Sequence, residues 1–319
     1  AGRLAAGARA LGALPRAAEA LTNTAKAYAR YATTASGEGS APPETEALLS
    51  ALAAAAAGRR GDFSLEQCVA LSRSLAAAGC KALPFGLAAP QEVAAHVHDA
   101  LGRAAGAGAT ALVESERGFK VLRQEGFLAP AETAELLELA APLWRPSQTY
   151  EGEAGARTSD TASLRGAAAE APVAAEVARR AAALVGLPAD HCETLQLVRY
   201  QGEGQYYREH LDLMEEPGQL LLGGQRVATV LVYLSSLPEG AGGETLFPEV
   251  GQGGVRVTPS AGAAVLWANV DAGGAPELLS RHAALPLGPA AAAAGPGGEP
   301  AVKYAVNCWI RAFPGASSL

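Results

Sequence analysis

The sequence predicts an α+β protein in which alanine-rich helices precede a β-sandwich or β-barrel. Apolar residues recur at helical spacing through residues 1–115. From Thr194 onward, short β-rich runs alternate with Gly- and Pro-rich turns. Many short strands joined by such turns are typical of sandwiches and barrels, and helices that come before them indicate an α+β arrangement.

The N-terminal region, residues 1–115, predicts helices but carries no chemical signal. Helices are expected over residues 64–79 and 90–104, and the segment SGEGSAPP at 36–43 is expected to be a turn-rich linker. No repeat near the length of a helical-repeat module is evident. We therefore assign this region no function.

The character of the chain changes near Glu116. A short strand is expected around 119–122, a helix over 129–141 that Pro130 opens, and a helix over 171–185 that stops before Gly186. The further strands that we expect are 195–200, 227–234, 255–258, 263–267 and 303–311. The low-complexity segment GPAAAAAGPGG at 288–298 is predicted to be a flexible loop inside this second domain.

Composition excludes several classes of protein. Hydrophobic residues make up 49% and charged residues 18%, which is typical of a folded chain, and the net charge of −7 argues against a broad nucleic-acid-binding surface. The chain starts at Ala1 and its single methionine is Met214, so we expect a fragment or a processed form. The cysteines form no CxxC pair, which argues against structural zinc and a disulfide scaffold; their disulfide state stays open for Cys68, Cys80, Cys192 and Cys308.

One short motif, His210-Leu211-Asp212, has metal-ligand character. On a strand, residues two apart project from the same face, so the imidazole and the carboxylate could converge on one ion. A third ligand should come from a distant strand, and His282 follows several further predicted strands. Two histidines and one carboxylate are the ligand set of non-haem Fe(II) oxygenases, which leaves coordination positions open. Taken alone, an HxD pair is also common by chance.

The other histidines have a structural interpretation. His96 and His98 lie in a predicted helix, where residues two apart point in different directions and could not easily share an ion. His191 follows a helix end and is expected to be a surface or capping group. Arg157 could contact a substrate or form a structural ion pair, and Arg226 is equally open.

Six ordered segments carry a resemblance to a known family. They are YQGEGQYYREHLD at 200–212, GGQRVATVLVYLS at 223–235, GGETLFP at 242–248, PSAGAAVLW at 259–267, SRH at 280–282 and KYAVNCW at 303–309. In this order they resemble the prolyl 4-hydroxylase (alpha-subunit-like) family of Fe(II)/2-oxoglutarate-dependent dioxygenases. The resemblance covers residues 116–315, so the expected domains are 1–115, of unknown role, and 116–315, the catalytic domain.

The resemblance implies a double-stranded β-helix (jelly-roll) core with supporting helices. It also implies that His210, Asp212 and His282 are the catalytic iron ligands. The cosubstrate 2-oxoglutarate would place its remote carboxylate on Lys303, a compact point charge. Arg311 is the alternative cation, because the insert at 288–298 separates Lys303 from His282 by more than the family's usual distance.

Four further residues are expected in the cosubstrate pocket. Thr229 and Tyr233 would add hydroxyl donors to the same carboxylate, because their strand lines the pocket in the family. Tyr207, three residues before His210, and Tyr200 are expected as pocket aromatics. The aromatic residues Trp267, Trp309 and Phe247 are more typical of a core than of a substrate platform.

The implied reaction is the hydroxylation of peptidyl proline to 4-hydroxyproline. It would consume O2 and 2-oxoglutarate, release succinate and CO2, and use L-ascorbate as the reductant that rescues oxidised iron. The alternatives are a same-fold oxygenase that acts on another protein side chain or a small molecule, and a non-catalytic jelly-roll binding module. The partner is expected to be a proline-containing peptide or protein rather than nucleic acid. Residence in the endoplasmic reticulum or secretory pathway is expected from similar enzymes, with the cytoplasm as the alternative, and the oligomeric state is left open.

Overall fold

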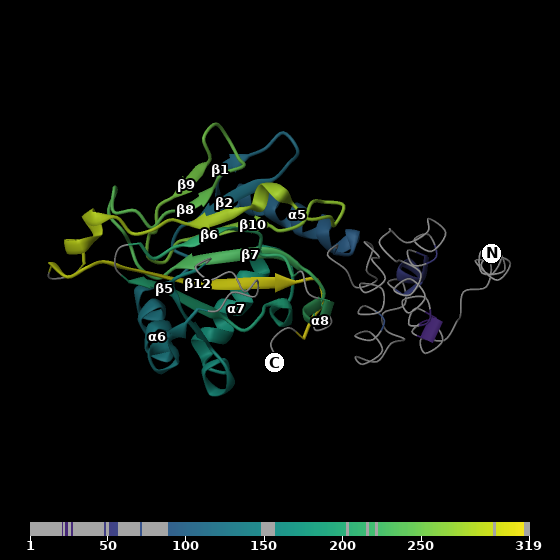
Figure 1. Ribbon diagram of the computed structural model, residues 1–319, viewed down its shortest axis with the longest axis horizontal. Helices are drawn as coiled ribbons and strands as arrows, with labels where there is room; N and C mark the ends of the chain where they lie inside the picture. The colour runs from purple at the N-terminus through teal and green to yellow at the C-terminus, as the bar shows by residue number, and fades with distance from the viewer. Residues whose placement is uncertain are drawn as a thin grey trace, which may run out of the picture. The chain divides into compact units, whose positions relative to one another are not determined.

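The computed structural model describes most of the chain from Ala89 onward (Figure 1). The described residues are 21, 23, 24, 27, 48, 51–56, 71, 89–147, 157–201, 204–214, 217–220, 223–295 and 298–315. Two compact units are present: Ala1–Ala88 together with Met214–Gln225, and Ala89–Leu213 together with Arg226–Leu319. Of the helix predicted over 64–79, all but Leu71 lies outside the described residues.

The second unit contains helices and two antiparallel sheets. The helices are α5 (Gln91–Gly106), α6 (Pro130–Ala140) and α7 (Pro172–Leu184), with 3-10 turns η3 (Ala141–Leu143), η4 (Gly166–Ala168), η5 (Ala189–His191), η6 (Leu278–Ser280) and η7 (Pro289–Ala293). The strands are β1 (Thr110–Glu114), β2 (Lys120–Gln124), β3 (Arg145–Pro146), β4 (Asp160–Ser163), β5 (Gln196–Gln201), β6 (Tyr207–His210), β7 (Arg226–Tyr233), β8 (Thr245–Phe247), β9 (Val255–Val257), β10 (Ala264–Ala268), β11 (His282–Ala284) and β12 (Val302–Arg311). In the first unit, α8 spans Pro217–Leu220.

The strand order is that of a jelly roll. The large sheet runs β1-β2-β10-β7-β12-β5-β4-β3, and the small sheet runs β6-β11-β8-β9. From β5 onward the chain crosses between the sheets, so β5, β7, β10 and β12 fall in the large sheet while β6, β8, β9 and β11 form the small one. This order confirms the predicted α+β class with a jelly-roll core.

Side-chain alternation along β7 separates two hydrophobic layers. Val230 and Val232 join the core beneath the helices, whereas Leu231 and Tyr233 point into the space between the two sheets. Successive residues of a strand project to opposite faces, so a strand buried on both sides must be apolar throughout, as VATVLVY is. Figure 1 shows α6 and α7 on one side of β5 and β12, with β6 on the other. The helices cover one face of the large sheet, so the pocket lies on its other face, between the two sheets.

The helix ends follow from local sequence. In α6 the Glu132 carboxylate accepts a hydrogen bond from the backbone N–H of Ala129 at 2.8 Å and also forms an ion pair with Arg180 of α7. Helix α7 ends at Leu184, and two residues later Gly186 has a φ of +74°, which favours glycine; a Cβ there would collide with His96. The predicted helices over 90–104, 129–141 and 171–185 and the predicted long strands thus agree with the structure to within a few residues.

Three features differ from the expectation. The second unit begins at Ala89 rather than 116, because β1 pairs with β2 and α5 packs against β7, β10 and β2. The segment 288–298 is not loop throughout: it contains η7, where the buried Ala291 accepts a backbone hydrogen bond from Ala301. Short strands such as β8 and β11, three residues each, had no signal of their own. Among the described helices, none has the length and apolar character needed to cross a membrane.

Candidate metal centre

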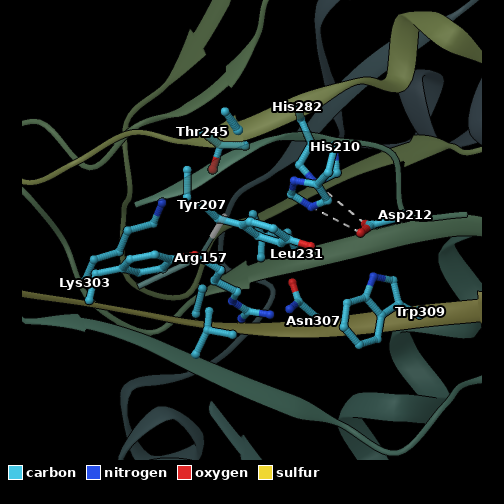
Figure 2. A pocket seen from close by; sticks show the side chains of 15 residues that line it. Arg157, Tyr207, His210, Asp212, Leu231, Thr245, His282, Lys303, Asn307 and Trp309 are labelled. Carbon is cyan, nitrogen blue, oxygen red and sulfur yellow. Dashed lines mark ion pairs between the residues drawn. The ribbon is translucent and has the colours of Figure 1, made fainter. Parts of the chain in front are cut away.

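His210, Asp212 and His282 lie together in a pocket between the two sheets (Figure 2). His210 ends β6 and pairs directly with His282, which begins β11. Their Nε2 atoms lie 3.5 Å and 3.7 Å from the two carboxylate oxygens of Asp212, and the candidate ligand atoms of all three fall within 4.8 Å of one another. The structure therefore brings together the three residues that the sequence suggested.

Each histidine is oriented by a hydrogen bond to the backbone carbonyl of the residue two positions before it. The Nδ1 atom of His210 lies 2.8 Å from the Arg208 carbonyl, and that of His282 lies 2.9 Å from the Ser280 carbonyl. Because a carbonyl can only accept, Nδ1 carries the proton in both rings and Nε2 keeps its lone pair. Both lone pairs then face the Asp212 carboxylate, which is the arrangement a metal ligand requires.

The electrostatics favour a charged carboxylate and a neutral imidazole. Burial alone would raise the pKa of Asp212, but the neighbouring His282 and His210 side chains and the Arg226 charge outweigh it and hold the pKa well below its usual range. Burial and the neighbouring His210 lower the pKa of His282 to about 4. At neutral pH Asp212 is therefore an anion and His282 a neutral nitrogen donor, which suits a borderline divalent ion.

Thr229 does not take the position that the resemblance implied. Its hydroxyl lies on β7 and donates to Asp212 Oδ2 at 2.8 Å, and the side-chain amide of Asn269 donates to that hydroxyl at 2.9 Å. Thr229 is fully buried and is not among the residues that line the pocket. The expectation that it binds the remote carboxylate of 2-oxoglutarate is therefore replaced by a role behind Asp212.

Lys303 lies at the opposite end of the same pocket from the His-Asp-His group, as Figure 2 shows. Its side chain is 2% exposed, and its Nζ lies 5.2 Å and 6.0 Å from the ring centres of Tyr200 and Tyr233. Among the described residues no carboxylate forms an ion pair with it, although Glu244 acts on it at longer range. Burial lowers its pKa to about 7. An anion that enters the pocket would therefore stabilise the charged form of this lysine.

A second expected hydroxyl, that of Tyr233, also acts indirectly. It donates to Thr245 Oγ1 at 2.8 Å, and Tyr233 itself does not line the pocket. Thr245, at the start of β8, does line the pocket, and its Oγ1 accepts the hydrogen bond from Tyr233. The sequence analysis did not name Thr245 as a site residue, although Thr245 lies within the GGETLFP segment. In the same segment Gly243 has a φ of +76°, and a Cβ at that position would collide with Leu237 and Leu287.

The two predicted pocket tyrosines both line the cavity. The ring of Tyr207 stacks on His210 with 3.6 Å between ring centres, and the Arg157 guanidinium lies 4.8 Å from the centre of the Tyr207 ring. Tyr200 is buried, and its hydroxyl interacts with Ser159 and Arg157. Burial raises the pKa of Tyr207 to about 12, so both phenols stay neutral in the physiological range. Arg157 also lines the pocket, so of its two predicted roles, a substrate contact or a structural ion pair, its position fits the substrate contact.

Arg311, the alternative cation, is committed elsewhere. Its Nη1 lies 3.0 Å from Glu193 Oε1, and Arg226 holds both oxygens of the same carboxylate at 2.7 Å and 2.8 Å. The Arg226 guanidinium also stacks 3.6 Å from the centre of the Trp309 ring, which lines the pocket. Lys303 is thus the cation at the inner end, and Trp309 is a wall of the pocket as well as a core residue.

The other histidines have structural partners. His96 and His98 lie 2.7 Å and 2.8 Å from the carbonyls of Gly186 and Val270, and His191 lies 2.9 Å from that of Arg311. The expectation that they are structural agrees with these contacts, but His191 is buried rather than at the surface as predicted. Cys192 and Cys308 are buried free thiols, and Cys68 and Cys80 lie outside the described residues.

The donor set fits a divalent metal at one end of the pocket and an anion at the other. Two neutral imidazoles and one carboxylate match the ligands that Fe(II) takes in a facial arrangement. A buried ammonium without an ion pair, beside a threonine hydroxyl, matches a carboxylate. A ligand that bridges both ends would carry metal-chelating oxygens at one end and a free carboxylate at the other.

Comparisons with known proteins agree with this geometry. Residues 195–311 match the family model of the 2OG-Fe(II) oxygenase superfamily, a span that contains all three candidate metal ligands and Lys303. Over 178 residues the chain is 35% identical to prolyl 4-hydroxylase subunit alpha-1 of Rattus norvegicus, covering 53% of this chain and 32% of that protein. Over 179 residues it is 31% identical to prolyl 4-hydroxylase 1 of Arabidopsis thaliana, covering 51% of this chain and 62% of that protein.

These matches confirm the resemblance to the prolyl 4-hydroxylase group of 2-oxoglutarate-dependent dioxygenases. The chain spans less than two thirds of the length of either relative. A solved structure of viral collagen prolyl hydroxylase from Paramecium bursaria Chlorella virus-1 aligns with a TM-score of 0.45 and 24% identity over 60% of this chain and 95% of that one. That likeness is too low to bear on function.

Proposed function

We propose that this chain catalyses the Fe(II)- and 2-oxoglutarate-dependent hydroxylation of peptidyl proline to 4-hydroxyproline, with release of succinate and CO2. The observation that carries the proposal is that His210, Asp212 and His282 share one pocket with Lys303, which is buried and forms no ion pair within the part of the chain that the structure describes. A metal site alone would fit many proteins. A metal site opposite a buried cation fits a chelating dicarboxylate.

In the proposed centre, His210 Nε2, His282 Nε2 and Asp212 would hold the iron. When bound, the metal and its cosubstrate supply the oxidising chemistry, and the protein supplies position and electrostatics. The chain's own contribution is visible in the hydrogen bonds that fix the two imidazoles and the carboxylate before any ligand arrives. Such partners of the ligands are needed to keep the donor atoms oriented.

Lys303 and Thr245 would bind the remote carboxylate of 2-oxoglutarate. The ammonium provides the charge, and Thr245, whose oxygen already accepts from Tyr233, provides a directed donor. The surrounding Tyr200, Leu231 and Ala305 exclude water from this end of the pocket. In such a dry environment a charged hydrogen bond is stronger than at the surface.

The substrate would enter beside Tyr207 and Trp309, which line the pocket near the metal ligands (Figure 2). Aromatic faces provide apolar contact area for a proline ring, and both rings are held rigidly, one against His210 and the other against Arg226. Arg157 and Asn307, also in the lining, offer donors to the carbonyls of a peptide backbone. The similarity to prolyl 4-hydroxylases supports proline as the target.

The proposal is tested by assaying the full chain with Fe(II), 2-oxoglutarate, ascorbate and proline-rich peptides. We expect succinate release that depends on iron and peptide, the gain of one oxygen atom by the peptide, and 4-hydroxyproline in its hydrolysate. Matched peptides with alanine in place of proline should stay unmodified. Oxygen on another side chain would point to the same-fold alternative, and ligand binding without turnover of any peptide would point to a non-catalytic module.

Two attributes of the proposal rest on family likeness alone. L-ascorbate is proposed as the reductant, and its omission should shorten the time for which turnover is linear without changing the initial rate. Residence in the secretory pathway, with the cytoplasm as the alternative, is proposed from the class of substrate. Localising the native protein in its source cells would decide between the two compartments.

A further inference from the structure

Behind Asp212 lies a pair of buried polar side chains, Thr229 and Asn269. Both are completely buried, and neither is among the residues that line the pocket. Thr229 belongs to β7 in the large sheet, and Asn269 directly follows β10, the neighbouring strand. Polar groups buried this deeply require hydrogen-bond partners, and the partners here form a chain that ends on a candidate metal ligand.

The direction of the hydrogen bonds in this chain can be assigned. The backbone of Asn269 is fixed on both sides, because its N–H donates to Val227 and its carbonyl accepts from Glu277. Its side-chain Nδ2 donates to Thr229 Oγ1 at 2.9 Å. The single hydroxyl proton of Thr229 then points to Asp212 Oδ2 at 2.8 Å rather than to Asn269 Oδ1 at 3.3 Å.

This chain distinguishes the two oxygens of the Asp212 carboxylate. Each oxygen faces an imidazole, Oδ1 at 3.5 Å from His210 Nε2 and Oδ2 at 3.7 Å from His282 Nε2, but Oδ2 in addition accepts the hydrogen bond from Thr229. An oxygen that accepts a directed hydrogen bond donates less electron density to a metal, and the bond also prevents the carboxylate from rotating. Oδ1 is therefore the oxygen that the protein offers to an ion.

We propose that Asn269 is a positioning residue that acts through Thr229 to keep Asp212 a ligand through one oxygen only. The inference rests on the proposed function. With two imidazoles and one carboxylate oxygen, an octahedral ion keeps three positions open. A chelating 2-oxoglutarate would take two of them, and the third would remain for O2. A carboxylate that bound through both oxygens would fill that third position.

The decisive variant is Thr229→Val, which preserves shape and removes the hydroxyl. Thr229→Ser restores a hydroxyl and should restore the wild-type behaviour. Thr133→Val is the matched control, because Thr133 is also a buried threonine but lies in α6. Asn269→Ala tests the outer partner with Thr229 intact, and the double variant tests whether Asn269 acts through Thr229.

The readout is the binding of nitric oxide, an O2 analogue, to the Fe(II)-loaded protein, followed by electron paramagnetic resonance. Without 2-oxoglutarate, Thr229→Val should bind nitric oxide as the wild type does. With 2-oxoglutarate bound, its affinity for nitric oxide should fall by about ten-fold or more, the lower range for loss of a hydrogen bond to a metal ligand. Asn269→Ala should show a smaller fall of the same kind and add nothing in the Thr229→Val background.

Equal nitric oxide affinity in wild type and Thr229→Val with 2-oxoglutarate present would overturn the inference while leaving the proposed function intact. An equal loss with and without 2-oxoglutarate would also overturn it, because that result indicates general damage to the site. A wild-type protein that bound neither Fe(II) nor 2-oxoglutarate would overturn the proposed function instead. If Thr229→Val fails to fold, Asn269→Ala alone must show the selective loss for the inference to stand.

Discussion

The two ends of the pocket differ in whether the protein supplies partners for the buried charge. At the metal end, Asp212 accepts a hydrogen bond from Thr229 and faces two imidazoles. Each imidazole is oriented by the backbone carbonyl of the residue two positions before it. At the other end, Lys303 is equally buried but forms no ion pair among the described residues. A buried charge without a partner is costly. The metal end is therefore organised by the protein itself, whereas the Lys303 end is completed only when an anion enters.

The largest effect should come from removing a ligand at the organised end. In His282→Ala the metal loses one of its three protein donors, so Mn(II) or Fe(II) affinity should fall by more than about 100-fold and turnover should drop to background. The measurement is metal titration by calorimetry together with succinate release.

His191→Ala is the matched control for this variant, because His191 is also buried and also bonds a backbone carbonyl through Nδ1. It should lower the melting temperature but leave the metal affinity within about two-fold. If His282→Ala bound metal as well as His191→Ala does, His282 would not be a ligand.

Lys303→Met should separate the two ends. Without the cation, 2-oxoglutarate affinity should fall by roughly 30-fold to 5,000-fold, the range for losing one partner of a buried charge pair, while metal affinity stays unchanged. Lys120→Met in β2 controls for the loss of a lysine elsewhere. Unchanged 2-oxoglutarate binding in Lys303→Met would return Arg311 to consideration as the cation.

Thr245→Val should have a smaller effect at the same end. Removing one hydrogen bond to a charged group should weaken 2-oxoglutarate binding by about ten-fold. Because Thr245 does not touch Asp212, nitric oxide binding to the Fe(II)-loaded protein should not depend on it, in contrast to Thr229. Equal behaviour of Thr229→Val and Thr245→Val in both assays would remove the distinction between the two ends.

The smallest effect concerns stability and pH. The pKa of Lys303 is about 7 in the folded protein against about 10.4 for an unfolded lysine. Between these values the unfolded state binds more protons, so the ligand-free protein should gain stability as pH rises from about 7 to about 10. Lys303→Met lacks this dependence, so its melting temperature should exceed that of the wild type by a few degrees near pH 7, with a difference that shrinks toward pH 10.

A constant difference in melting temperature across that pH range would contradict the low pKa of Lys303. Adding 2-oxoglutarate should reverse the order of the two proteins near pH 7, because only the wild type gains the buried ion pair. Thermal unfolding with and without the ligand measures both points.

Long elements were predictable because their signal is local. The run VATVLVY and the amphipathic segments of α6 and α7 carry their periodicity within a few residues, and the structure places them where the sequence indicated. The strands β8 and β11 were not, because three residues are too few to show a period. The start of the second unit was misplaced for a related reason: the role of α5 depends on the sheet it covers, which lies far away in the chain.

The candidate metal ligands were suggested by spacing, since His210 and Asp212 share one segment and His282 follows in an ordered motif. The hydroxyl partners were a different matter. Thr229 and Tyr233 were expected at the remote carboxylate, but Thr229 contacts Asp212 and Tyr233 contacts Thr245. Which hydroxyl meets which neighbour depends on the strand of the other sheet that lies opposite, and a linear motif does not contain that information.

The sequence by itself determined the fold class, the long elements, the ligand types and the presence of a basic residue on the last strand. Tertiary structure alone decided that Lys303 is buried with no ion pair to another described residue, that Thr245 rather than Thr229 lines its pocket, and that Asn269 lies behind Asp212. The physical reason is range. Periodicity and the types of ligand can be recognised from residues that are close in the sequence. Burial and hydrogen-bond partners are set only when two sheets from distant parts of the chain pack face to face.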